Sequence, residues 1–386
     1  MTFPPSFTRS GLRFVSRDSV GRRASLHQFT ITEHFRTVRA LVTMKVVVVG
    51  GGVVGLSSAL CVKDRCPQAE LTVVAAEFTP NTTGDGAAGI IQPQLWDVTQ
   101  EELTWLQWTF DHLSRLYTTD FSSQIGLFCQ SGYNVFDREV PDPPWKDIVH
   151  GFRHLTEEEV KKFPGYSYGW FTTTLMLECR SYLPWLTQRL KEKGVKFEQR
   201  KIASLSEVCS DYDVVINCCG LSARTLLNDQ GVKPGRGQIV RVHAPWIKHF
   251  LLTHNLSTTY YNSPYIIPGI NVVAMGGLNQ LGDWNEGWRE EDEKKIWDGA
   301  VEMIPSLKGA RVVGKWTGLR PVRERIRLER DTVNDTPVIH NYGHGGYGVT
   351  YHWGCALQAA ILAAKAMDDI HVAAKTSSYR VPKSRH

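Results

Sequence analysis

Three glycines with the spacing of a nucleotide-binding turn stand directly after a β-branched run near position 50. Gly50 allows a tight turn, Gly52 lets the backbone approach a phosphate closely, and Gly55 permits close packing of a helix on a strand. The N-terminus of the helix that follows offers free N–H groups and a positive dipole end to an anion. We therefore predict a dinucleotide site in this turn, formed by Gly50, Gly51, Gly52, Val53, Val54 and Gly55.

The type of dinucleotide depends on residues further along the chain. In such sites an acid at the end of the second strand binds ribose hydroxyls, and Glu77, 22 residues after Gly55, is the candidate. The glycine turn followed by an acid after the second strand occurs in both NAD and FAD sites, so it does not identify the cofactor. A second glycine cluster at residues 343–348 opens another predicted helix, whose N-terminus would stabilise negative charge on a reduced flavin ring. The two clusters together favour FAD.

Arg320 precedes Pro321, and the proline restricts the arginine to an extended conformation. An arginine held in this way can bind a carboxylate through two parallel hydrogen bonds, although a single arginine is more often structural. Arg323, Arg325 and Arg327 alternate along a predicted strand, and we interpret them as a solvated or ion-paired edge.

Tyr260, Tyr261 and Tyr265 form a short aromatic cluster. Their flat faces and hydroxyls suit a binding site, but an aromatic stripe on a sheet is the simpler interpretation. His344 lies in the second glycine cluster, where a structural role is more frequent than that of a base. No Gly-x-Ser-x-Gly elbow or Cys/His pair indicates hydrolysis, so no acid–base or nucleophilic residue is predicted.

Hydrophobic periodicity and turn residues predict a series of strands and helices. The predicted strands are 45–49, 71–76, 195–200, 214–217, 238–244, 259–267, 272–277 and 338–342. The predicted helices are 53–63, 101–117, 155–163, 180–194, 290–297 and 352–367, of which 290–297 is charged and assigned to the solvated surface. Residues 125–145 are interpreted as turn-rich because they contain three prolines.

This order of elements predicts an α/β fold with a Rossmann-like cofactor domain built from discontinuous segments, plus an antiparallel-sheet α+β substrate domain. We assign 44–96, 183–230 and 324–375 to the cofactor domain, and 97–182 and 231–323 to the substrate domain. Residues 1–43 form an N-terminal extension and 376–386 a C-terminal tail. The extension has the composition of a transit peptide, but we favour Met44 as the true start, preceded by an extended gene model or a disordered tail.

The composition excludes several classes of protein. Apolar content of 42% and charged content of 22% are ordinary for a globular protein. Seven arginines and two acids in residues 1–43 account for the whole net charge of +5, so no nucleic-acid-binding surface is indicated. The eight cysteines lack metal-ligand spacing, so no metal site is predicted. The longest apolar run is broken by glycines and is not a membrane span.

Six segments carry motifs that occur together in one family. They are residues 46–56, 78–80 with 87–89, 234–238, 261–265, 318–323 and 340–348. In these segments the chain resembles the D-amino-acid oxidases, FAD enzymes whose family includes the D-aspartate oxidases. The likeness covers about residues 44–384, and its last two motifs are highly specific.

The resemblance implies a role for each matching site residue. Arg320 would pair with the substrate carboxylate, and the hydroxyl of Tyr265 would donate to the same group. Tyr261 would sit on a mobile lid, the carbonyl of Gly346 would receive the substrate amine, and Gln92 would line the pocket.

The resemblance also implies flavin contacts beyond the first turn. They are Glu77, Thr82, Thr83, Gly89, Ile90, Arg200, Ile202, Cys219, Gly345, Gly346, Gly348, Val349 and Thr350. The family usually has Asp-Arg where this chain has Ala76-Glu77, and threonines where it has Gly84 and Cys219. These differences bear on the affinity for the adenosine and phosphates rather than on the chemistry.

The implied reaction is oxidative deamination of a D-amino acid to a 2-oxo acid, ammonia and hydrogen peroxide, by hydride transfer from Cα to flavin N5. Residues 254–265 contain no basic residue except His254, so a side-chain carboxylate would be buried without a cation. We therefore expect neutral D-amino acids as substrates. The alternatives are a D-aspartate oxidase, a glycine- or sarcosine-type amine oxidase, and a catalytically idle flavin-binding interaction protein.

The expected partners are a D-amino acid and O2, without nucleic acid or integral membrane contact. The C-terminal Ser384-Arg385-His386 matches a peroxisomal signal in its first two positions only. Together with the family, this favours a peroxisomal location over a cytosolic one. The family also implies a homodimer.

Overall fold

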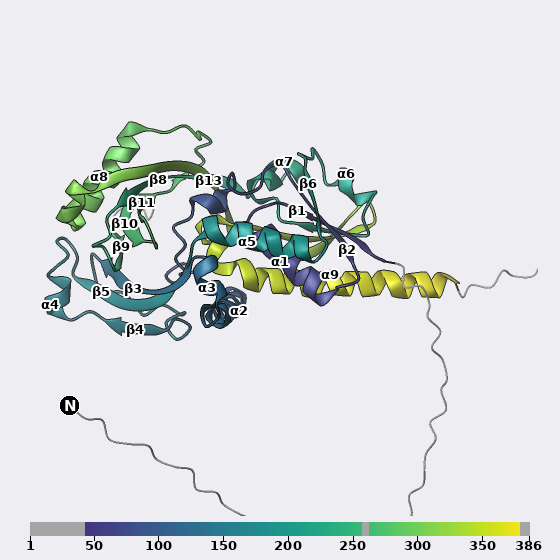
Figure 1. The fold of residues 1–386 in the computed structure, drawn as a ribbon, viewed down its shortest axis with the longest axis horizontal. Coiled ribbons are helices and arrows are strands. Elements are labelled where there is room, and N and C mark those ends of the chain that lie inside the picture. The colour runs from purple at the N-terminus through teal and green to yellow at the C-terminus, as the bar shows by residue number, and fades with distance from the viewer. Residues whose placement is uncertain (1–42, 257–261, 379–386) are drawn as a thin grey trace, which may run out of the picture. The chain divides into compact units, whose positions relative to one another are not determined.

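In the computed structural model, residues 43–256 and 262–378 are described. Their strands form one sheet in the order β4-β5-β3-β9-β10-β11-β8-β13-β14-β7-β1-β2-β6, with the short β12 (Gln280–Leu281) paired to β8. Figure 1 shows the two ends of this sheet, one around β1 and β2 and the other around β3 and β5. Among the described residues, no helix is long and apolar enough to cross a membrane.

One end of the sheet is parallel, as a dinucleotide-binding unit requires. It contains β1 (Lys45–Val49), β2 (Glu70–Ala75), β6 (Lys196–Gln199), β7 (Val214–Asn217) and β14 (Thr336–His344). β1 pairs in parallel with β2 and β7, and these pair in parallel with β6 and β14. The β-branched strands predicted from the sequence are therefore confirmed, and so is the Rossmann-like class.

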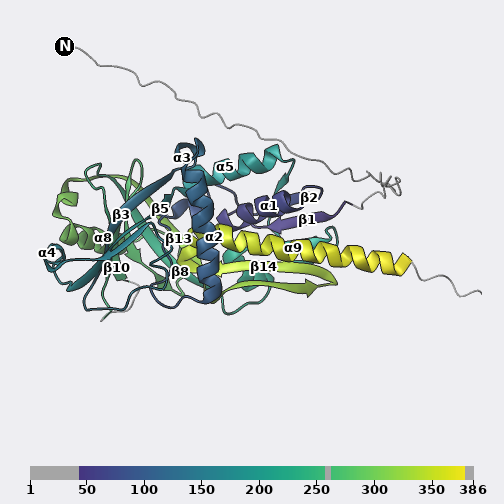
Figure 2. The ribbon, with the colours of Figure 1, turned by 90° about the horizontal axis from the view of Figure 1, so that it is seen from below.

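Helices cover both faces of the parallel strands, which is why these strands are apolar throughout. Val46, Val48 and neighbouring strand residues pack on α1 (Val53–Arg65), α5 (Cys179–Glu192) and α9 (Gly348–Ser378). α1 and α9 lie side by side in both ribbon views (Figures 1 and 2). Val47, Val49 and Val215 face the opposite layer, which includes α6 (Ser206–Cys209), with α7 (Ala223–Leu226) beside it.

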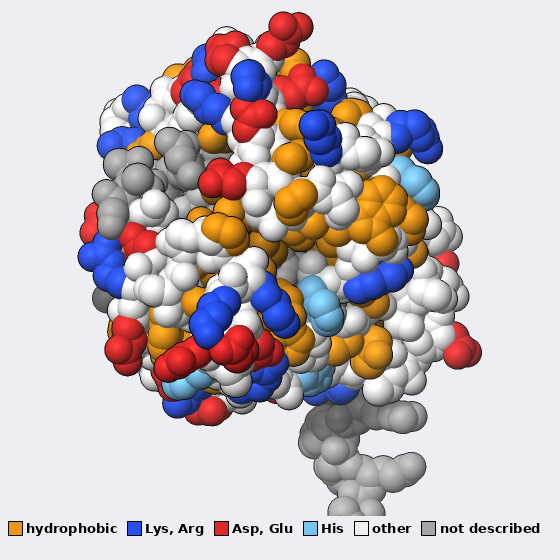
Figure 3. All heavy atoms as spheres, turned by 90° about the vertical axis from the view of Figure 1, so that its left-hand side faces the viewer, with side chains coloured by type: hydrophobic (Ala, Val, Ile, Leu, Met, Phe, Trp, Pro, Cys, Tyr) orange, Lys and Arg blue, Asp and Glu red, His pale blue; other side chains and the backbone are white. Residues whose placement is uncertain are grey.

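The other end of the sheet is mainly antiparallel, which confirms the second predicted part of the fold. It contains β3 (Leu127–Phe136), β4 (Gly151–His154), β5 (Tyr168–Leu177), β8 (Lys233–His243), β9 (Phe250–His254), β10 (Asn262–Pro268) and β11 (Val273–Leu278). α8 (Glu290–Met303) packs on one face of β8, β10 and β11. The outer face at this end has a central band of hydrophobic side chains, with charged ones mainly above and below it (Figure 3).

Several predictions for this end were incomplete or wrong. Residues 125–145 contain the ten-residue β3 and are not merely turn-rich, because the prolines follow the strand. α2 (Gln100–Tyr117) is confirmed, whereas the predicted helix 155–163 is reduced to α4 (Glu157–Val160). α9 begins four residues earlier than predicted and extends to Ser378.

β13 (Arg311–Val333) is the largest element that the sequence analysis missed. This 23-residue strand pairs with β8 along its first half and with β14 along its second half. It therefore joins the antiparallel and parallel ends in one sheet. Its alternating Arg323, Arg325 and Arg327 are ion-paired to Asp229, Asp97 and Glu329, as the edge interpretation predicted.

The glycine turn between β1 and α1 is packed against the chain on two sides and open on the third. Gly50 has φ +127°, and a Cβ there would lie 2.3 Å from the carbonyl oxygen of Cys218. A Cβ on Gly55 would lie 2.0 Å from the carbonyl oxygen of Gly50. At Gly52, in contrast, nothing lies within 4 Å of an added Cβ. This open side is where a ligand can approach the helix N-terminus.

The two kinds of glycine should respond differently to substitution. We expect Gly55→Ala to lower the free energy of unfolding by about 1–3 kcal/mol, because overpacking forces the turn apart. Gly52→Ala should leave the apoprotein's thermal unfolding almost unchanged but weaken binding of the predicted flavin, because the methyl group occupies the open side. Thermal unfolding and flavin titration of both variants separate the two effects. Equal flavin affinity in Gly52→Ala and the wild type would contradict this assignment.

Candidate functional site

The N-terminus of α1 has the properties of a phosphate site. Its N-cap residue, Gly52, provides no side-chain hydrogen bond to the helix, and the first turn contains no acidic residue. The N–H groups of the first turn and the dipole therefore remain available to an anion on the open side of the turn. Glu77 follows β2 and is exposed, with its carboxylate accepting a 3.4 Å bond from Asn81 Nδ2. These residues fit a dinucleotide.

The loop from residue 79 to residue 89 is held by an internal carboxylate. Asp85 is buried and accepts hydrogen bonds from Thr79 Oγ1 at 2.7 Å and from both the backbone N (2.9 Å) and Oγ1 (2.7 Å) of Thr82. Thr83 Oγ1 donates to the Leu319 carbonyl at 3.3 Å. The hydroxyls of the two predicted flavin-contacting threonines are thus committed to the protein. Through Thr83, the loop is hydrogen-bonded to β13, the strand that carries Arg320.

The loop ends in a tight connection to β5. Gly89 has φ +93°, and a Cβ there would lie 2.4 Å from the Leu177 carbonyl oxygen. Ile90 then forms an isolated bridge with Met176. The two predicted flavin-contacting residues Gly89 and Ile90 therefore lie where the loop meets the antiparallel strands.

The second glycine cluster brings cofactor and substrate residues together. β14 ends at His344, and residues 345–347 form a single turn before α9 begins at Gly348. A Cβ on Gly346 would lie 3.5 Å from Arg320 Cδ. Thr350 Oγ1 donates to the Gln92 carbonyl at 3.1 Å, and Val349 is buried. A cofactor that reaches this second helix N-terminus is therefore next to Arg320.

Arg320 and Tyr265 meet over the site-facing side of β8 and β11. A Cβ on Gly237 would lie 2.2 Å from Arg320 Nη1, so the guanidinium lies directly on the strand, and Nη1 donates to the Leu278 carbonyl at 3.1 Å. The Tyr265 ring covers Gly276 in the same way, with the hydroxyl 2.3 Å from an added Cβ. Burial raises the pKa of Tyr265 although the charge of Arg320 opposes this, so the hydroxyl stays protonated and can donate.

A buried polar network adjoins these residues. Gln92 Nε2 donates to Asn134 Oδ1 at 3.0 Å, and Asn134 Nδ2 donates back to Gln92 Oε1 at 3.3 Å. His254 Nε2 also contacts Asn134 Oδ1, at 3.0 Å. Burial lowers the pKa of His254 to about 3, so its imidazole is neutral. Asn134 was missed by the sequence analysis because nothing in its local pattern distinguishes it from other strand residues.

The remaining predicted residues lie at the edge of the parallel strands or outside the described structure. Arg200 is partly exposed and already paired, with Nε 2.5 Å from Glu198 Oε1 and Nη1 3.5 Å from Glu207 Oε2. Ile202 is buried, and burial raises the pKa of the Cys219 thiol to about 12, so this cysteine is not a thiolate. Tyr261 lies outside the described residues. The guanidinium of Arg200 therefore has no unpaired charge to offer a phosphate.

Among the residues that the structure describes, the histidines near Arg320 are not suited to general base catalysis at neutral pH. His344 is buried, and this burial lowers its pKa to about 3. His352 in α9 is also buried, with its pKa lowered to about 4 for the same reason. Within residues 43–256 and 262–378, no group of three or more His, Cys, Asp or Glu side chains is placed to hold a metal ion. The arrangement could position an anion beside a bound cofactor.

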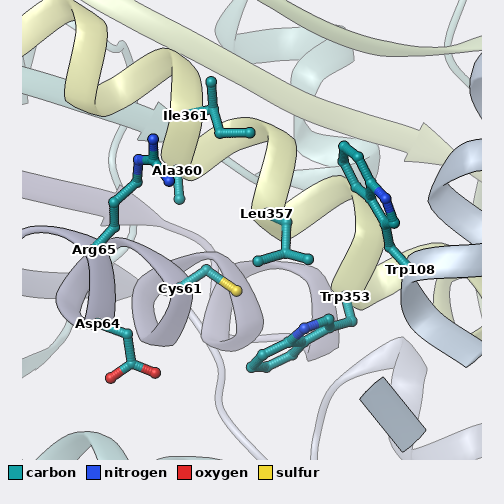
Figure 4. A pocket seen from close by; sticks show the side chains of 8 residues that line it. All are labelled: Cys61, Asp64, Arg65, Trp108, Trp353, Leu357, Ala360 and Ile361. Atoms are coloured by element: carbon teal, nitrogen blue, oxygen red, sulfur yellow. The ribbon is translucent and has the colours of Figure 1, made fainter. Parts of the chain in front are cut away.

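A separate cavity of about 390 Å³ lies away from these residues, between α1, α2 and α9 (Figure 4). Trp108, Trp353 and Leu357 form its apolar wall, and Arg65 stands at its edge. None of its lining residues is among those predicted to bind cofactor or substrate.

The neutral histidines predict an acid-sensitive fold. His344 and His352 have folded-state pKa values of about 3 and about 4, whereas an unfolded histidine titrates near 6.5. The unfolded chain therefore binds more protons below pH 6.5, and stability falls with pH by about 1.4 kcal/mol per unit for each histidine. Their contribution is constant above that pH. Thermal unfolding between pH 7.5 and 5 should show a shallower decline for His344→Asn, and equal declines would contradict the assignment.

The chain is similar to known proteins in both sequence and fold. Residues 45–362 match the family model described as FAD dependent oxidoreductase. The chain is 39% identical over 328 residues to human D-aspartate oxidase, covering 83% of this chain and 94% of that protein. It is 36% identical to D-amino-acid oxidase of Rubrobacter xylanophilus, covering 86% and 99%, and 34% identical to D-amino acid oxidase of Dugesia ryukyuensis, covering 81% and 95%.

Solved structures with the same fold have much lower sequence identity. Glycine oxidase from Geobacillus kaustophilus superposes with a TM-score of 0.67 at 16% identity, covering 85% of this chain and 95% of that one. L-proline dehydrogenase from P. horikoshii gives 0.66 at 15%, covering 84% and 96%. At this identity the likeness establishes the fold alone. The family match and the identities above 30% show that the chain belongs to the FAD-dependent oxidoreductase family that includes the D-amino-acid and D-aspartate oxidases.

Proposed function

We propose that this protein is an FAD-dependent oxidase that deaminates neutral D-amino acids to 2-oxo acids, ammonia and hydrogen peroxide. The observation that carries the proposal is the meeting of Arg320 with Tyr265 and with Gly346, beside the second of two helix N-termini that have no acidic residue in the first turn. Arg320 and Tyr265 can serve an oxidase only if the carboxylate that they bind lies beside the cofactor, because the substrate Cα must reach the flavin. The D-amino-acid oxidases among its relatives support the same activity.

The residues of the chain would hold the substrate rather than move its protons. Arg320 binds the carboxylate with its fork of N–H donors, and the protonated Tyr265 adds one more donor. The Gly346 carbonyl would accept a hydrogen bond from the amine in its neutral form. These contacts orient Cα, which is the main contribution a protein makes to such a reaction.

FAD would supply the redox chemistry when bound, as the acceptor at N5 of the hydride from Cα and the source of electrons for O2. The imino acid formed at the same time then hydrolyses to the 2-oxo acid and ammonia. His254 and His344, with pKa values of about 3, remain neutral and leave the charge of the site to its arginines. The residues present fit this cofactor because both helix N-termini lack acidic residues in their first turns.

D-aspartate is the second candidate substrate, and one residue favours it. Arg241 is buried, and its Nη2 donates to the carbonyls of Asp85 and Gly86 at 3.2 Å, while Nη1 has no hydrogen-bond partner among the described residues. Burial and the neighbouring Arg180 lower the pKa of Arg241 to about 10, yet it stays charged at neutral pH. The human D-aspartate oxidase relative points the same way. Neutral substrates remain the proposal because Nη1 is enclosed by protein and His254 is uncharged.

Other properties expected from the sequence also remain proposals. We propose a homodimer, the division into the two domains assigned above, and a peroxisomal location. The signal residues 384–386 and residues 1–42 of the predicted extension lie outside the described residues. Sedimentation of the purified protein at twice its 43.5 kDa mass would support the dimer, and a monomer would contradict it.

A peroxide assay across a panel of amino acids tests the proposed activity. We expect D-alanine, D-serine or D-proline to be oxidised far faster than D-aspartate, and L- and N-methyl amino acids to be inactive. D-aspartate turnover exceeding that of D-alanine would contradict the neutral-substrate proposal, and sarcosine or glycine as the best substrate would replace it. If none of the substrates yields peroxide and the protein has no flavin absorption, the alternative of a catalytically idle interaction protein would be supported.

Substitution of the carboxylate-binding residues tests their roles. Arg320→Gln removes the paired donors, so kcat/KM for D-alanine should fall by about 100-fold or more, as for a charged hydrogen-bonding partner. Tyr265→Phe should cost about 10-fold, because one neutral donor is lost. Flavin absorbance of each variant should match the wild type, which shows that the cofactor site is intact. Wild-type kcat/KM in Arg320→Gln would remove the basis of the proposal.

A further inference from the structure

Arg236 is fully buried one residue before Gly237, on the opposite face of β8 from the carboxylate-binding Arg320. Each nitrogen of its guanidinium donates hydrogen bonds to acceptors among the described residues. Nε donates to the Asn285 carbonyl at 2.6 Å, Nη1 to Gln280 Oε1 at 2.6 Å and Asp292 Oδ2 at 2.8 Å, and Nη2 to Gln238 Oε1 and the Gly287 carbonyl at 2.7 Å.

Asp292 is the anionic partner of Arg236 and comes from α8, the helix predicted to be a solvated surface element. That prediction was wrong for this residue, because Asp292 is 1% exposed. Its carboxylate also accepts bonds from Gln280 Nε2, at 3.2 Å to each oxygen. The pair thus ties α8 to the side of β8 that faces away from the site.

Two links run from this buried pair to Arg320. The first is the backbone of β8: the Arg320 guanidinium lies on Gly237, next to Arg236 in the chain. The second is the segment of residues 278–280. Arg320 Nη1 donates to the Leu278 carbonyl at 3.1 Å, and Gln280, two residues later, pairs with Arg236 in the sheet and binds it with its side chain.

Two of the surfaces that contact the Arg320 guanidinium, the β8 strand and the Leu278 carbonyl, are therefore held by one buried cluster. We infer that the Arg236–Asp292 pair is a positioning unit that sets the orientation of Arg320 toward the substrate carboxylate. The inference rests on the proposed function, because it assumes that Arg320 binds that carboxylate. Arg236 and Asp292 touch no substrate and are positioning residues only.

The physical reason is that two parallel hydrogen bonds to a carboxylate depend on direction. Removing one partner of a buried ion pair leaves an uncompensated charge, and the surrounding chain moves to relieve it. Here the segments that would move are the strand under the guanidinium and the carbonyl that holds Nη1. A displacement of about 1 Å is enough to weaken a positioned contact strongly.

The test is a double-mutant cycle on the FAD-loaded protein, with benzoate as a simple carboxylate probe. We expect Asp292→Asn to weaken benzoate binding by about tenfold when Arg320 is present. In an Arg320→Lys background, which has already lost the forked geometry, the same substitution should change the affinity by less than about twofold. The kcat/KM for D-alanine should fall by a similar factor in Asp292→Asn, while its flavin absorbance stays at the wild-type value because the cofactor site is untouched.

Two further variants separate positioning from mere stability. Ile296→Ala shortens another buried side chain of α8 without breaking any of these bonds, so it should lower the unfolding temperature but leave benzoate affinity at the wild-type value. Gln280→Met removes the side-chain link without leaving a buried charge unpaired. It should weaken benzoate binding by about threefold even if Asp292→Asn does not fold.

The outcomes distinguish this inference from the function on which it rests. If the wild type neither binds benzoate nor oxidises D-alanine, the proposed function fails. If the wild type does both, but Gln280→Met keeps wild-type affinity or the cycle is additive, only the positioning role is overturned. A loss of benzoate affinity in Ile296→Ala equal to that of the other variants would also overturn it.

Discussion

The pairing of β13 with β8 is the constraint on which the candidate site depends. It places Gly235 opposite Arg320 and Gly237 opposite Gly318, so the guanidinium can lie on a strand that has no side chain beneath it. Because β13 continues into its pairing with β14, the same strand also fixes the second glycine turn relative to Arg320. A slip of one residue would turn Arg320 to the α8 face and separate it from the turn.

The charge of the site is set by its arginines, because the neighbouring histidine and tyrosine side chains are neutral. Burial holds His254 and His344 uncharged and keeps the Tyr265 hydroxyl protonated, while Arg241 stays cationic and Arg320 adds a second guanidinium. The described part of the site therefore offers positive charge and hydrogen-bond donors, and its histidines are too weakly basic to act as a base. This combination suits a reaction in which the protein orients an anionic substrate and the cofactor removes the electrons.

The parallel half of the fold could be predicted from the sequence because its local signals are consistent with one another. Its β-branched runs predict strands, and the glycines that follow them predict tight turns into helices. Prediction from the sequence failed at β13, where alternating charged residues obscure a strand defined by its partners on both sides. Arg320 and Tyr265 were identified from motifs, but Asn134, Arg241 and Asp292 acquire their surroundings only through pairing between distant segments. The environment of a polar residue in an antiparallel sheet depends on such non-local contacts, which no local pattern encodes.

The central claim is that a D-amino acid held by Arg320 delivers electrons to a flavin bound between the two glycine turns. The most direct measurement is the absorption spectrum of the purified protein before and after D-alanine is added in the absence of air. The structure predicts a yellow protein whose flavin absorption is bleached by D-alanine and returns when air is admitted. A protein without flavin absorption, or one whose spectrum no D-amino acid changes, would contradict the claim.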